Sequence, residues 1–340
     1  INGTCMGGAT ELSLACHGRV ASNAKSVKIG LPEVKVGIFP GAGGTQRVAR
    51  LANTQDALQM MTTGQTLSAA RAKAMNLVHQ VVEPGELINA AKQMIKDGLK
   101  PVAPWDEKGF KLPGGPVYSA AGANLWPPAI AILRRETYGN YPAATAILKC
   151  VYEGLQVPFD TGLRIEQRYF TEIVQTTEAY SMIRSLFVSM QELNKGARRP
   201  AGQPKSEIKK VGVVGAGFMG ASIAYVTAAA GINVVLIDRD MEAATKGKTH
   251  SEGLVAGAVG KGKLTKDEGD KLLSLITPSD DYGTLADADL VIEAVFEDRA
   301  LKARVTQEAE PQLAAGGFFA SNTSTLPISG LAMASARPEK

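Results

Sequence analysis

The chain has 340 residues, which is more than one compact domain usually needs and favours two domains or a larger parent protein. Apolar residues make up 45% of the chain and charged residues 21%, a balance that excludes a disordered or collagen-like protein. The formal net charge of +4 is small and scattered, so we expect no nucleic-acid partner.

Cysteine spacing and hydropathy narrow the class of protein further. The three cysteines match neither a disulfide framework nor a zinc site, so we expect no metal. Asn233 and Asp238 interrupt the best apolar run before it reaches the ~18 residues of a membrane span. We therefore expect no integral membrane segment and a reducing, cytoplasmic location. Because the chain opens at Ile1 without a signal pattern and closes at Lys340 within unfinished sequence, we interpret it as an internal piece of a longer protein.

Proline content and apolar periodicity divide the chain into stretches that predict different secondary structure. Residues 1–96 are glycine-rich and then helical, whereas the prolines of 97–159 argue against long helices or central strands there. Apolar side chains three or four residues apart in 160–195 predict one long amphipathic helix that stops at Gly196, and residues 197–206 are typical of a linker. We predict a partial domain over 1–96, a linker region with this long helix over 97–206, and a second domain over 207–340.

A glycine-rich motif follows the first buried strand of the second domain. Residues 210–214 predict that strand, and the motif Gly-Ala-Gly-Phe-Met-Gly occupies 215–220. Residues 221–230 then predict a helix, and 233–237 predict a second strand that ends at Asp238, 18 residues beyond the last glycine of the motif. Strand, motif, helix and acid in this order predict a dinucleotide-binding site in an α/β fold with a doubly wound parallel sheet of Rossmann type.

Each residue of this motif has a distinct physical role. Gly215 allows the tight turn, Gly217 lets the backbone approach a pyrophosphate, and Gly220 lets the helix pack closely on the strand. Unpaired N–H groups at the helix start attract the anion. Asp238 would accept hydrogen bonds from ribose hydroxyls and repel a 2′-phosphate, which favours NAD over NADP, although the neighbouring Arg239 weakens this preference. The alternative is a flavodoxin-like helix turn without a ligand.

Two later strands end in polar residues. Residues 289–294 and 318–321 predict these strands, and Glu297 and Ser324 follow them closely. Ligands of doubly wound sheets lie at the carboxyl ends of the strands, where both side chains fall. Spacing alone favours ordinary structural roles instead, with Glu297 as a carboxylate in a first helical turn and Ser324 as a helix N-cap.

Together these segments resemble the cofactor domain of L-3-hydroxyacyl-CoA dehydrogenases. The resemblance implies NAD as the cofactor, with Ser324 also near the 3-hydroxyl of the substrate. It further implies that a helical hairpin at 242–273 helps to hold CoA, although its lysines are equally a solvated basic face. The residues that the resemblance places at NAD are Gly215, Gly217, Met219, Gly220, Asp238, Val295, Phe296, Glu297, Lys302 and Ser324.

The catalytic base of that family is a His paired with a Glu, both of which follow the Asn-Thr-Ser strand. The histidines of this chain are His17, His79 and His250, and none follows residue 321. The resemblance therefore implies that the chain binds NAD but lacks the group that takes the hydroxyl proton. Oxidation by this piece alone should be slow, because general-base help is worth ~10²–10⁴-fold.

A pair of acids accompanies two glycine-rich bends near the start of the chain. Glu11 lies in the first turn of a predicted helix after Gly7 and Gly8, and Glu33, 22 residues later, precedes a glycine-rich segment at 40–47. A backbone N–H at a glycine turn can stabilise an oxyanion, and two carboxylates that share a water can activate it and handle a proton. On spacing alone, Glu11 could instead complement the helix dipole and Glu33 could be a surface acid.

Residues 7–12, 31–33 and 40–47 resemble the second half of the crotonase domain of enoyl-CoA hydratases, which has a ClpP-like spiral fold. Retention of both acids favours hydration over the isomerase and hydrolase branches of that fold. The chain departs from the family at His17, which stands where many members have an acid and which we interpret as structural.

This second resemblance implies roles for the front residues. The Gly8 N–H would polarise the thioester carbonyl, and the Gly41 N–H would help to place the water. Glu11 and Glu33 would hold the water that adds to the β carbon, and one of them would protonate the α carbon, without the sequence deciding which. The second oxyanion donor and most of the CoA pocket would lie upstream of Ile1.

A crotonase half, a connecting helix and a dehydrogenase start occur in this order in the multifunctional alpha subunits of fatty-acid β-oxidation complexes. Residues 139–143 and 164–170 resemble the linker of that family, and the helix at 159–193 would then pack on the hydratase. The implied partners are acyl-CoA thioesters and a thiolase beta subunit. Two alternatives stay open, namely a module that binds NAD without turnover and a crotonase-fold enoyl-CoA isomerase.

Overall fold

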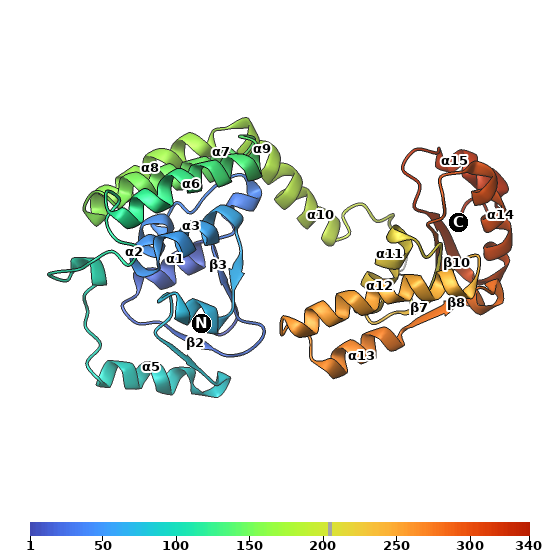
Figure 1. The fold of residues 1–340 in the computed structure, drawn as a ribbon, viewed down its shortest axis with the longest axis horizontal. Helices are drawn as coiled ribbons and strands as arrows, with labels where there is room; N and C mark the ends of the chain where they lie inside the picture. Colours follow the sequence, from blue (N-terminus) through green and yellow to red (C-terminus); the bar gives the residue numbers. More distant parts are fainter. Residues whose placement is uncertain (203–205) are drawn as a thin grey trace. The chain divides into compact units, whose positions relative to one another are not determined.

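The computed structural model describes residues 1–202 and 206–340, which divide into two compact units, Ile1–Pro200 and Ala201–Lys340 (Figure 1). Part of the linker predicted at 197–206 therefore lies outside the described residues. Each unit has its own buried apolar core. The domain bounds drawn from the sequence stay a prediction.

The first half of unit 1 combines short strands with helices. Strand β3 (Lys28–Gly30) lies between β1 (Thr4–Met6), which is parallel to it, and β4 (Thr66–Leu67), which is antiparallel. Strand β2 (Val20–Ser22) pairs with β5 (Gln80–Val82). The helices of this half are α1 (Gly8–Ala15), α2 (Gly44–Leu51), α3 (Thr54–Thr63), α4 (Ala69–Ala74) and α5 (Leu87–Lys96).

Long helices occupy the second half of unit 1, which corrects the expectation drawn from its prolines. Helix α6 (Ala120–Thr137) continues through Pro127 and Pro128, and α7 (Pro142–Gly154) begins on a proline. The N–H groups that Pro127 and Pro128 lack would have bonded to residues 123 and 124, which are exposed, so those carbonyls face water. At the first position of α7 a proline costs no helical hydrogen bond.

The helix predicted over 160–195 is broken, and the prediction of one long helix is wrong. Helix α8 (Phe159–Val174) stops, and a second helical rod runs from α9 (Thr177–Met182) through a π-helical stretch, η4 (Ile183–Ser189), into α10 (Met190–Asn194). Thr176 causes the break, because its backbone is extended and its hydroxyl caps α9 by accepting from the Ala179 N–H. The stop near Gly196 is as predicted, since its φ is +72°.

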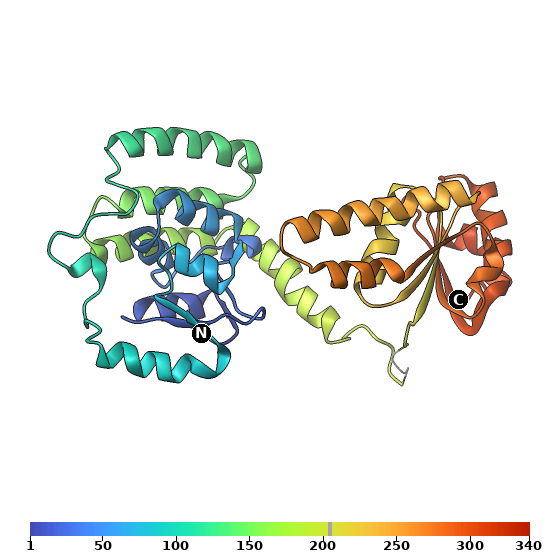
Figure 2. The same cartoon turned by 60° about the horizontal axis from the view of Figure 1, so that its bottom comes forward.

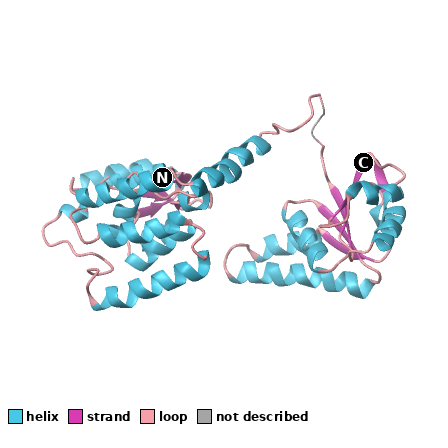
Figure 3. Ribbon diagram, turned by 90° about the horizontal axis from the view of Figure 1, so that it is seen from above, coloured by secondary structure: helices cyan, strands magenta, loops and turns pink. Residues whose placement is uncertain are grey.

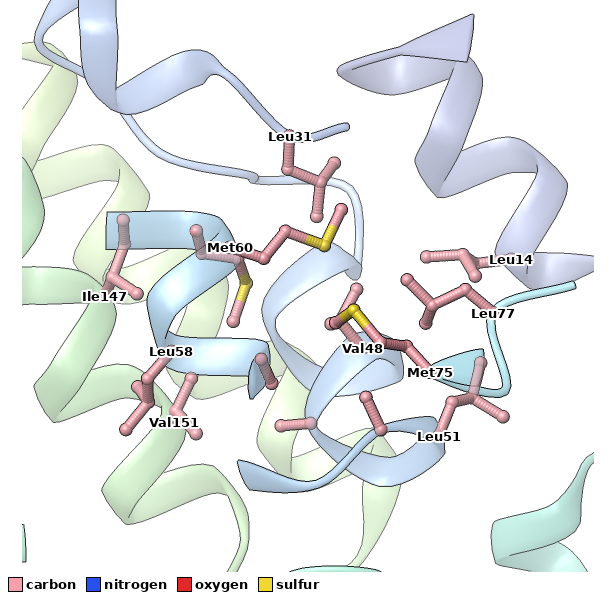
Figure 4. Close-up of a cluster of buried hydrophobic side chains, with 14 of the residues drawn as sticks. Leu14, Leu31, Val48, Leu51, Leu58, Met60, Met75, Leu77, Ile147 and Val151 are labelled. Carbon is pink, nitrogen blue, oxygen red and sulfur yellow. The ribbon is translucent and has the colours of Figure 1, made fainter. Parts of the chain in front are cut away.

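Helix α7 belongs to the core of unit 1. Ile147 and Val151 of α7 lie beside Leu58 and Met60 of α3 in the same buried cluster (Figure 4). Helices α7 and α8 also pack on each other and on α2. The segment after residue 97 is therefore an integral layer of this unit, and it carries α8 to the glycine-rich bend before α2.

Unit 2 is a doubly wound α/β domain. Among the described residues it holds a five-stranded parallel sheet in the order β10-β9-β6-β7-β8, which is the Rossmann order around the first strand. Helices α11 and α12 cover one face and α14 the other (Figure 3). The strands are β6 (Lys210–Val214), β7 (Asn233–Ile237), β8 (Ile276–Ser279), β9 (Ala288–Glu293) and β10 (Leu313–Ser321). The helices are α11 (Phe218–Ala229), α12 (Met241–Gly260), α13 (Lys266–Ser274), α14 (Arg299–Ala309) and α15 (Ile328–Leu331).

The strand predictions for this domain match closely. Strands β6 and β7 have the predicted bounds, and β9 is shifted by one residue. Strand β10 is longer than predicted because residues 313–317 extend it toward its amino end. Helices α12 and α13 form the predicted hairpin after β7, and they run side by side in Figure 2.

Gly220 is the tightest glycine of the β6–α11 turn and provides a stability test. A Cβ at Gly220 would lie 1.7 Å from the carbonyl oxygen of Gly215, whereas one at Gly217 would meet no heavy atom of the described residues within 4 Å. We expect Gly220→Ala to lower the free energy of unfolding of unit 2 by about 1–3 kcal/mol or more. Gly217→Ala, the matched control, should cost about 1 kcal/mol or less, through helix capping alone.

Urea unfolding followed by amide NMR signals of unit 2 measures both losses. Equal losses in the two variants would contradict the close contact between the helix and the glycine turn.

Candidate functional site

Glu11 is held by the glycine-rich bend that precedes α2. Its side chain is buried, and its Oε1 accepts hydrogen bonds from the Ala42 and Gly44 N–H groups, both at 2.8 Å. The bend needs glycine, because Gly43 has a φ of +92° and a Cβ at Gly44 would lie 2.7 Å from Glu11 Oε1. Peptide amides therefore fix the position of this carboxylate.

Glu33 lies beside this bend at the start of a short 3-10 helix, η1 (Glu33–Val36). Its Oε1 is 3.1 Å from the place where a Cβ of Gly7 would stand, which puts it against the glycine turn before α1. Its Oε2 is buried and has no hydrogen-bond partner among the described residues. The pKa of Glu33 is raised to about 7, mainly by burial and to a smaller extent by the charges of Glu11 and Glu166, while a hydrogen bond from its own backbone lowers it.

Such a carboxyl group exchanges its proton near neutral pH, which is what general acid–base chemistry requires. The two predicted acids therefore lie close enough to interact, and the predicted glycine bends adjoin them. The candidate site of unit 1 is an acid pair flanked by backbone amides.

A third acid, Glu166 of α8, completes this group and is absent from the residues predicted above. Its side chain is fully buried, and its carboxylate accepts from the Gly43 N–H and from both the N–H and hydroxyl of Thr45. One signal in the sequence could have found it, because Glu166 stands three residues after Leu163 and four before Phe170, on the apolar face of its helix. A charge on such a face needs a specific buried partner.

The glycines predicted to donate N–H groups flank the acid pair. Gly8 is exposed and is the first residue of α1, after the turn at Gly7 with a φ of +57°. No side chain of the described residues caps this helix end, so its first amides are open to a ligand. Gly41 lies under the ring of Phe170, since a Cβ there would be 2.5 Å from that ring.

The glycine turn of unit 2 opens on a groove at the carboxyl ends of the strands. Gly215 has a φ of +102° and lies against the Ala294 carbonyl, which excludes a side chain there. The Gly217 backbone is exposed, and Asp238 at the tip of β7 accepts the Ala216 N–H at 2.7 Å. A cavity of about 630 Å³ is lined by Gly215, Gly217, Asp238, Arg239, Tyr282, Val295 and Phe296, among other residues.

Exposed apolar side chains rim this groove. Phe296 lines the groove and is 80% exposed, and Phe218 and Met219, at the start of α11 next to Gly217, are 78% and 49% exposed. Large apolar side chains that are this exposed are typical of a surface that a ligand covers. The donor set, the open glycine backbone and the apolar rim fit a dinucleotide.

Glu297 and Ser324 lie together at the same carboxyl end of the sheet, after the strands β9 and β10 that follow β6 in the sheet order. Glu297 accepts from the Thr323 hydroxyl at 2.5 Å and from the Ser324 N–H at 3.3 Å. Several hydrogen bonds lower the pKa of Glu297 to about 2, and the one from the Thr323 hydroxyl has the largest effect. Glu297 is therefore ionised at neutral pH, with Ser324 exposed beside it.

Lys302 lies below this surface instead of on it. Its side chain is buried, and its Nζ is 2.8 Å from Glu293 Oε1 and 3.2 Å from Glu297 Oε2. Glu293, the last residue of β9, also accepts from the Ser321 hydroxyl and the Val295 N–H, and it too is absent from the predicted residues. These contacts support a role for Lys302 and Glu293 in holding Glu297 and the strand ends that carry Val295 and Ser321.

Comparisons with known proteins give a family model for each of the two regions that hold the candidate sites. Residues 1–102 match the family model described as enoyl-CoA hydratase/isomerase, and residues 210–340 match the model described as 3-hydroxyacyl-CoA dehydrogenase, NAD binding domain. Each model matches a different region, so a region similar to hydratases and isomerases precedes a region similar to dehydrogenases. This confirms the predicted α/β fold class, with crotonase and Rossmann parts, and NAD as the cofactor of the second part.

Curated relatives carry the same pair of regions over the whole chain. The chain is 37% identical over 343 residues to the "Fatty acid oxidation complex subunit alpha" of Shewanella frigidimarina and, equally, to that of Shewanella loihica. Each alignment covers 100% of the chain and 48% of the relative, so the chain spans about half the length of these proteins. The predicted resemblance to β-oxidation alpha subunits is confirmed.

Among solved structures, FadB2 of M. tuberculosis is 40% identical over 39% of this chain and 47% of its own, with a TM-score of 0.38.

A search of the described residues for a helix that could span a membrane, by its length and its apolar content, finds none. Over the same residues, no cluster of His, Cys, Asp and Glu has the arrangement of a metal site.

The raised pKa of Glu33 has a consequence for stability. Between pH 4.5, its ordinary value, and about 7, the folded chain binds more protons than the unfolded chain, so stability falls as pH rises through this window. Glu33→Gln cannot titrate there. We expect its free energy of unfolding, relative to the wild type, to increase from pH 4.5 to 7 and to level off above.

Trp105 and Trp126 are the tryptophans of the chain and both lie in unit 1, so their fluorescence during urea unfolding measures this difference. Parallel pH curves for the wild type and Glu33→Gln would show that Glu33 titrates normally.

Proposed function

We propose that the protein hydrates trans-2-enoyl-CoA to L-3-hydroxyacyl-CoA in unit 1 and binds NAD in unit 2 for the oxidation of that product. The observation that carries this proposal is the acid pair of Glu11 and Glu33, which lies between glycine bends in the same chain as a complete dinucleotide turn. Family membership of both regions supports it. Acyl-CoA thioesters are the proposed substrates, and a thiolase beta subunit is a proposed partner of the whole protein.

The hydration step assigns the acids different roles. Glu11 takes a proton from water while the oxygen of that water bonds to the β carbon. Its Oε1 accepts hydrogen bonds from two amides, which leaves Oε2 for this proton. Glu33, which burial keeps partly protonated, gives its proton to the α carbon. The Gly8 N–H stabilises the enolate oxygen that forms between these events, and the Gly41 N–H helps to place the water. Exchange with solvent returns both acids to their starting states.

In unit 2 the chain's residues would bind and orient the cofactor. The exposed Gly217 backbone at the start of α11 would face the pyrophosphate, while Gly215, whose N–H bonds to the Ile237 carbonyl, and the buried Gly220 shape the turn. Asp238 would face the ribose hydroxyls, and Met219, Val295 and Phe296 the apolar surface of the dinucleotide. Glu297 and Ser324 would lie at the nicotinamide end. NAD supplies the hydride acceptor when bound.

A narrower function, NAD binding without turnover, is the second candidate. The separate core of unit 2 and its complete groove favour it.

A cytoplasmic location stays a proposal, supported by the absence of disulfides at Cys5, Cys16 and Cys150.

Replacement of Glu33 tests the hydratase directly. We expect Glu33→Gln to slow water addition to a short trans-2-enoyl-CoA by ~10²–10⁴-fold, because the proton for the α carbon is lost. Glu172→Gln makes the same charge change at an exposed position of α8 and should leave the rate unchanged. Loss of absorbance of the enoyl thioester measures both.

Wild-type-like hydration by Glu33→Gln would remove Glu33 from the site. Migration of the double bond without uptake of labelled water oxygen would identify an isomerase instead.

Replacement of Asp238 tests the cofactor site without any turnover. We expect Asp238→Asn to bind NAD about 10–100-fold more weakly, since hydrogen bonds to a charged acceptor are lost, and to discriminate less against NADP. Asp270→Asn, on the exposed surface of α13, is the control. Calorimetric titration of the 340-residue chain measures the affinities, and equal affinities of the two variants would contradict the assignment.

A further inference from the structure

The bend before α2 divides its amides between two carboxylates. Ala42 and Gly44 donate their N–H groups to Glu11, whereas Gly43 and Thr45, the residues between and after them, donate to Glu166. Successive amides of the bend therefore point to alternate sides. Neither set can change direction without turning the peptide planes that orient the other.

Glu166 accepts its hydrogen bonds from this bend. Its side chain is fully buried, and the hydrogen bonds that satisfy it come from Gly43 and from Thr45, including the Thr45 hydroxyl. An unsatisfied buried carboxylate costs several times more than a neutral polar group, so the bend and the carboxylate hold each other in place.

Other contacts keep α8 rigid over the bend. Arg50 of α2 donates to the carbonyls of Gly154 and Val157, at the turn that leads into α8. The ring of Phe170, one helical turn after Glu166, covers Gly41. The carboxylate is therefore delivered to the bend by a helix that is anchored on either side of it.

We propose that Glu166 is a positioning residue of the hydration site, which holds the Gly43–Thr45 bend so that the Ala42 and Gly44 amides face Glu11, and which places a negative charge beside Glu33. The proposal rests on the proposed function of unit 1. It makes activity of the front region depend on a helix that lies more than a hundred residues along the chain.

The charge of Glu166 has a measurable effect on its neighbour. Burial first, and then the charges of Glu11 and Glu166, raise the pKa of Glu33 to about 7. Other ionisable groups on η1 and on the elements packed against it are unchanged in the variants below. They are Lys35 on η1, Asp56 on α3, Glu178 and Tyr180 on α9, and Arg184 on η4.

Glu166→Gln removes the charge and keeps the shape, and Glu172→Gln is the matched control on the exposed face of the same helix. In the 340-residue chain with ¹³C-labelled glutamate, we expect the titration midpoint of Glu33 to move below its wild-type value in Glu166→Gln and to stay in Glu172→Gln. A merely structural Glu166 would leave the midpoint where it is. An unmoved midpoint overturns the proposed charge effect.

Glu166→Asp keeps the charge but draws it back by one methylene, and it carries the test if the glutamine variant does not fold. We expect the Glu33 midpoint to stay raised, while the Gly43 and Thr45 amides exchange with solvent about tenfold faster or more. Unchanged exchange overturns the positioning role.

Hydration kinetics separate this proposal from the function on which it rests. In an active protein, both Glu166 variants should lower kcat about tenfold or more with little change in KM. The reason is that the substitutions displace the two catalytic acids but leave substrate binding intact. If the wild type shows no hydration, the proposed function fails, and the titration and exchange results still decide whether Glu166 positions the acids.

Discussion

Peptide amides that hold carboxylates are the constraint on which unit 1 depends. The bend at residues 42–45 has no charged side chain of its own, yet it satisfies two buried acids by pointing successive N–H groups in opposite directions. A Cβ at Gly44 would meet Glu11, and Gly43 has a positive φ, so only glycine allows this arrangement. Because both acids are fixed by backbone amides and not by flexible side chains, their carboxyl groups stay beside Glu33. The burial of Glu33 and the charge of these groups keep its proton available near neutral pH.

Unit 2 uses the same donor for a different anion. The glycine turn after β6 leaves the Gly217 backbone exposed at the start of α11, where the helix dipole favours a phosphate. At the same carboxyl end of the sheet, beside β6, Lys302 is buried between Glu293 and Glu297, and its single positive charge balances one of these two carboxylates. The charge that reaches the surface there is that of Glu297, held by hydroxyls and amides of residues 323–325.

Local sequence patterns predicted most of the strands and the glycine turn of unit 2. They predicted little of how α8 is joined to the glycine-rich bend in unit 1. Strands β6 and β7, the glycine turn and Asp238 lie within 29 residues, and each is specified by its neighbours in sequence. The apolar face of its helix could have singled out Glu166, but local patterns could not identify its partners Gly43 and Thr45, which lie 123 and 121 residues away. The prediction from the prolines failed because it also depended on the tertiary structure. A helix tolerates Pro127 only if the carbonyl that loses its partner can face water. The break of the long helix at Thr176 also outweighed an apolar period that continued across it.

The alternating pattern of amides is the central claim, and NMR couplings across hydrogen bonds test it most directly. In the deuterated, ¹⁵N,¹³C-labelled chain, the amide nitrogens of Ala42 and Gly44 should correlate with the carboxyl carbon of Glu11, and those of Gly43 and Thr45 with that of Glu166. Correlation of all four with one carboxyl group, or with neither acid, would contradict this account of how the site is held.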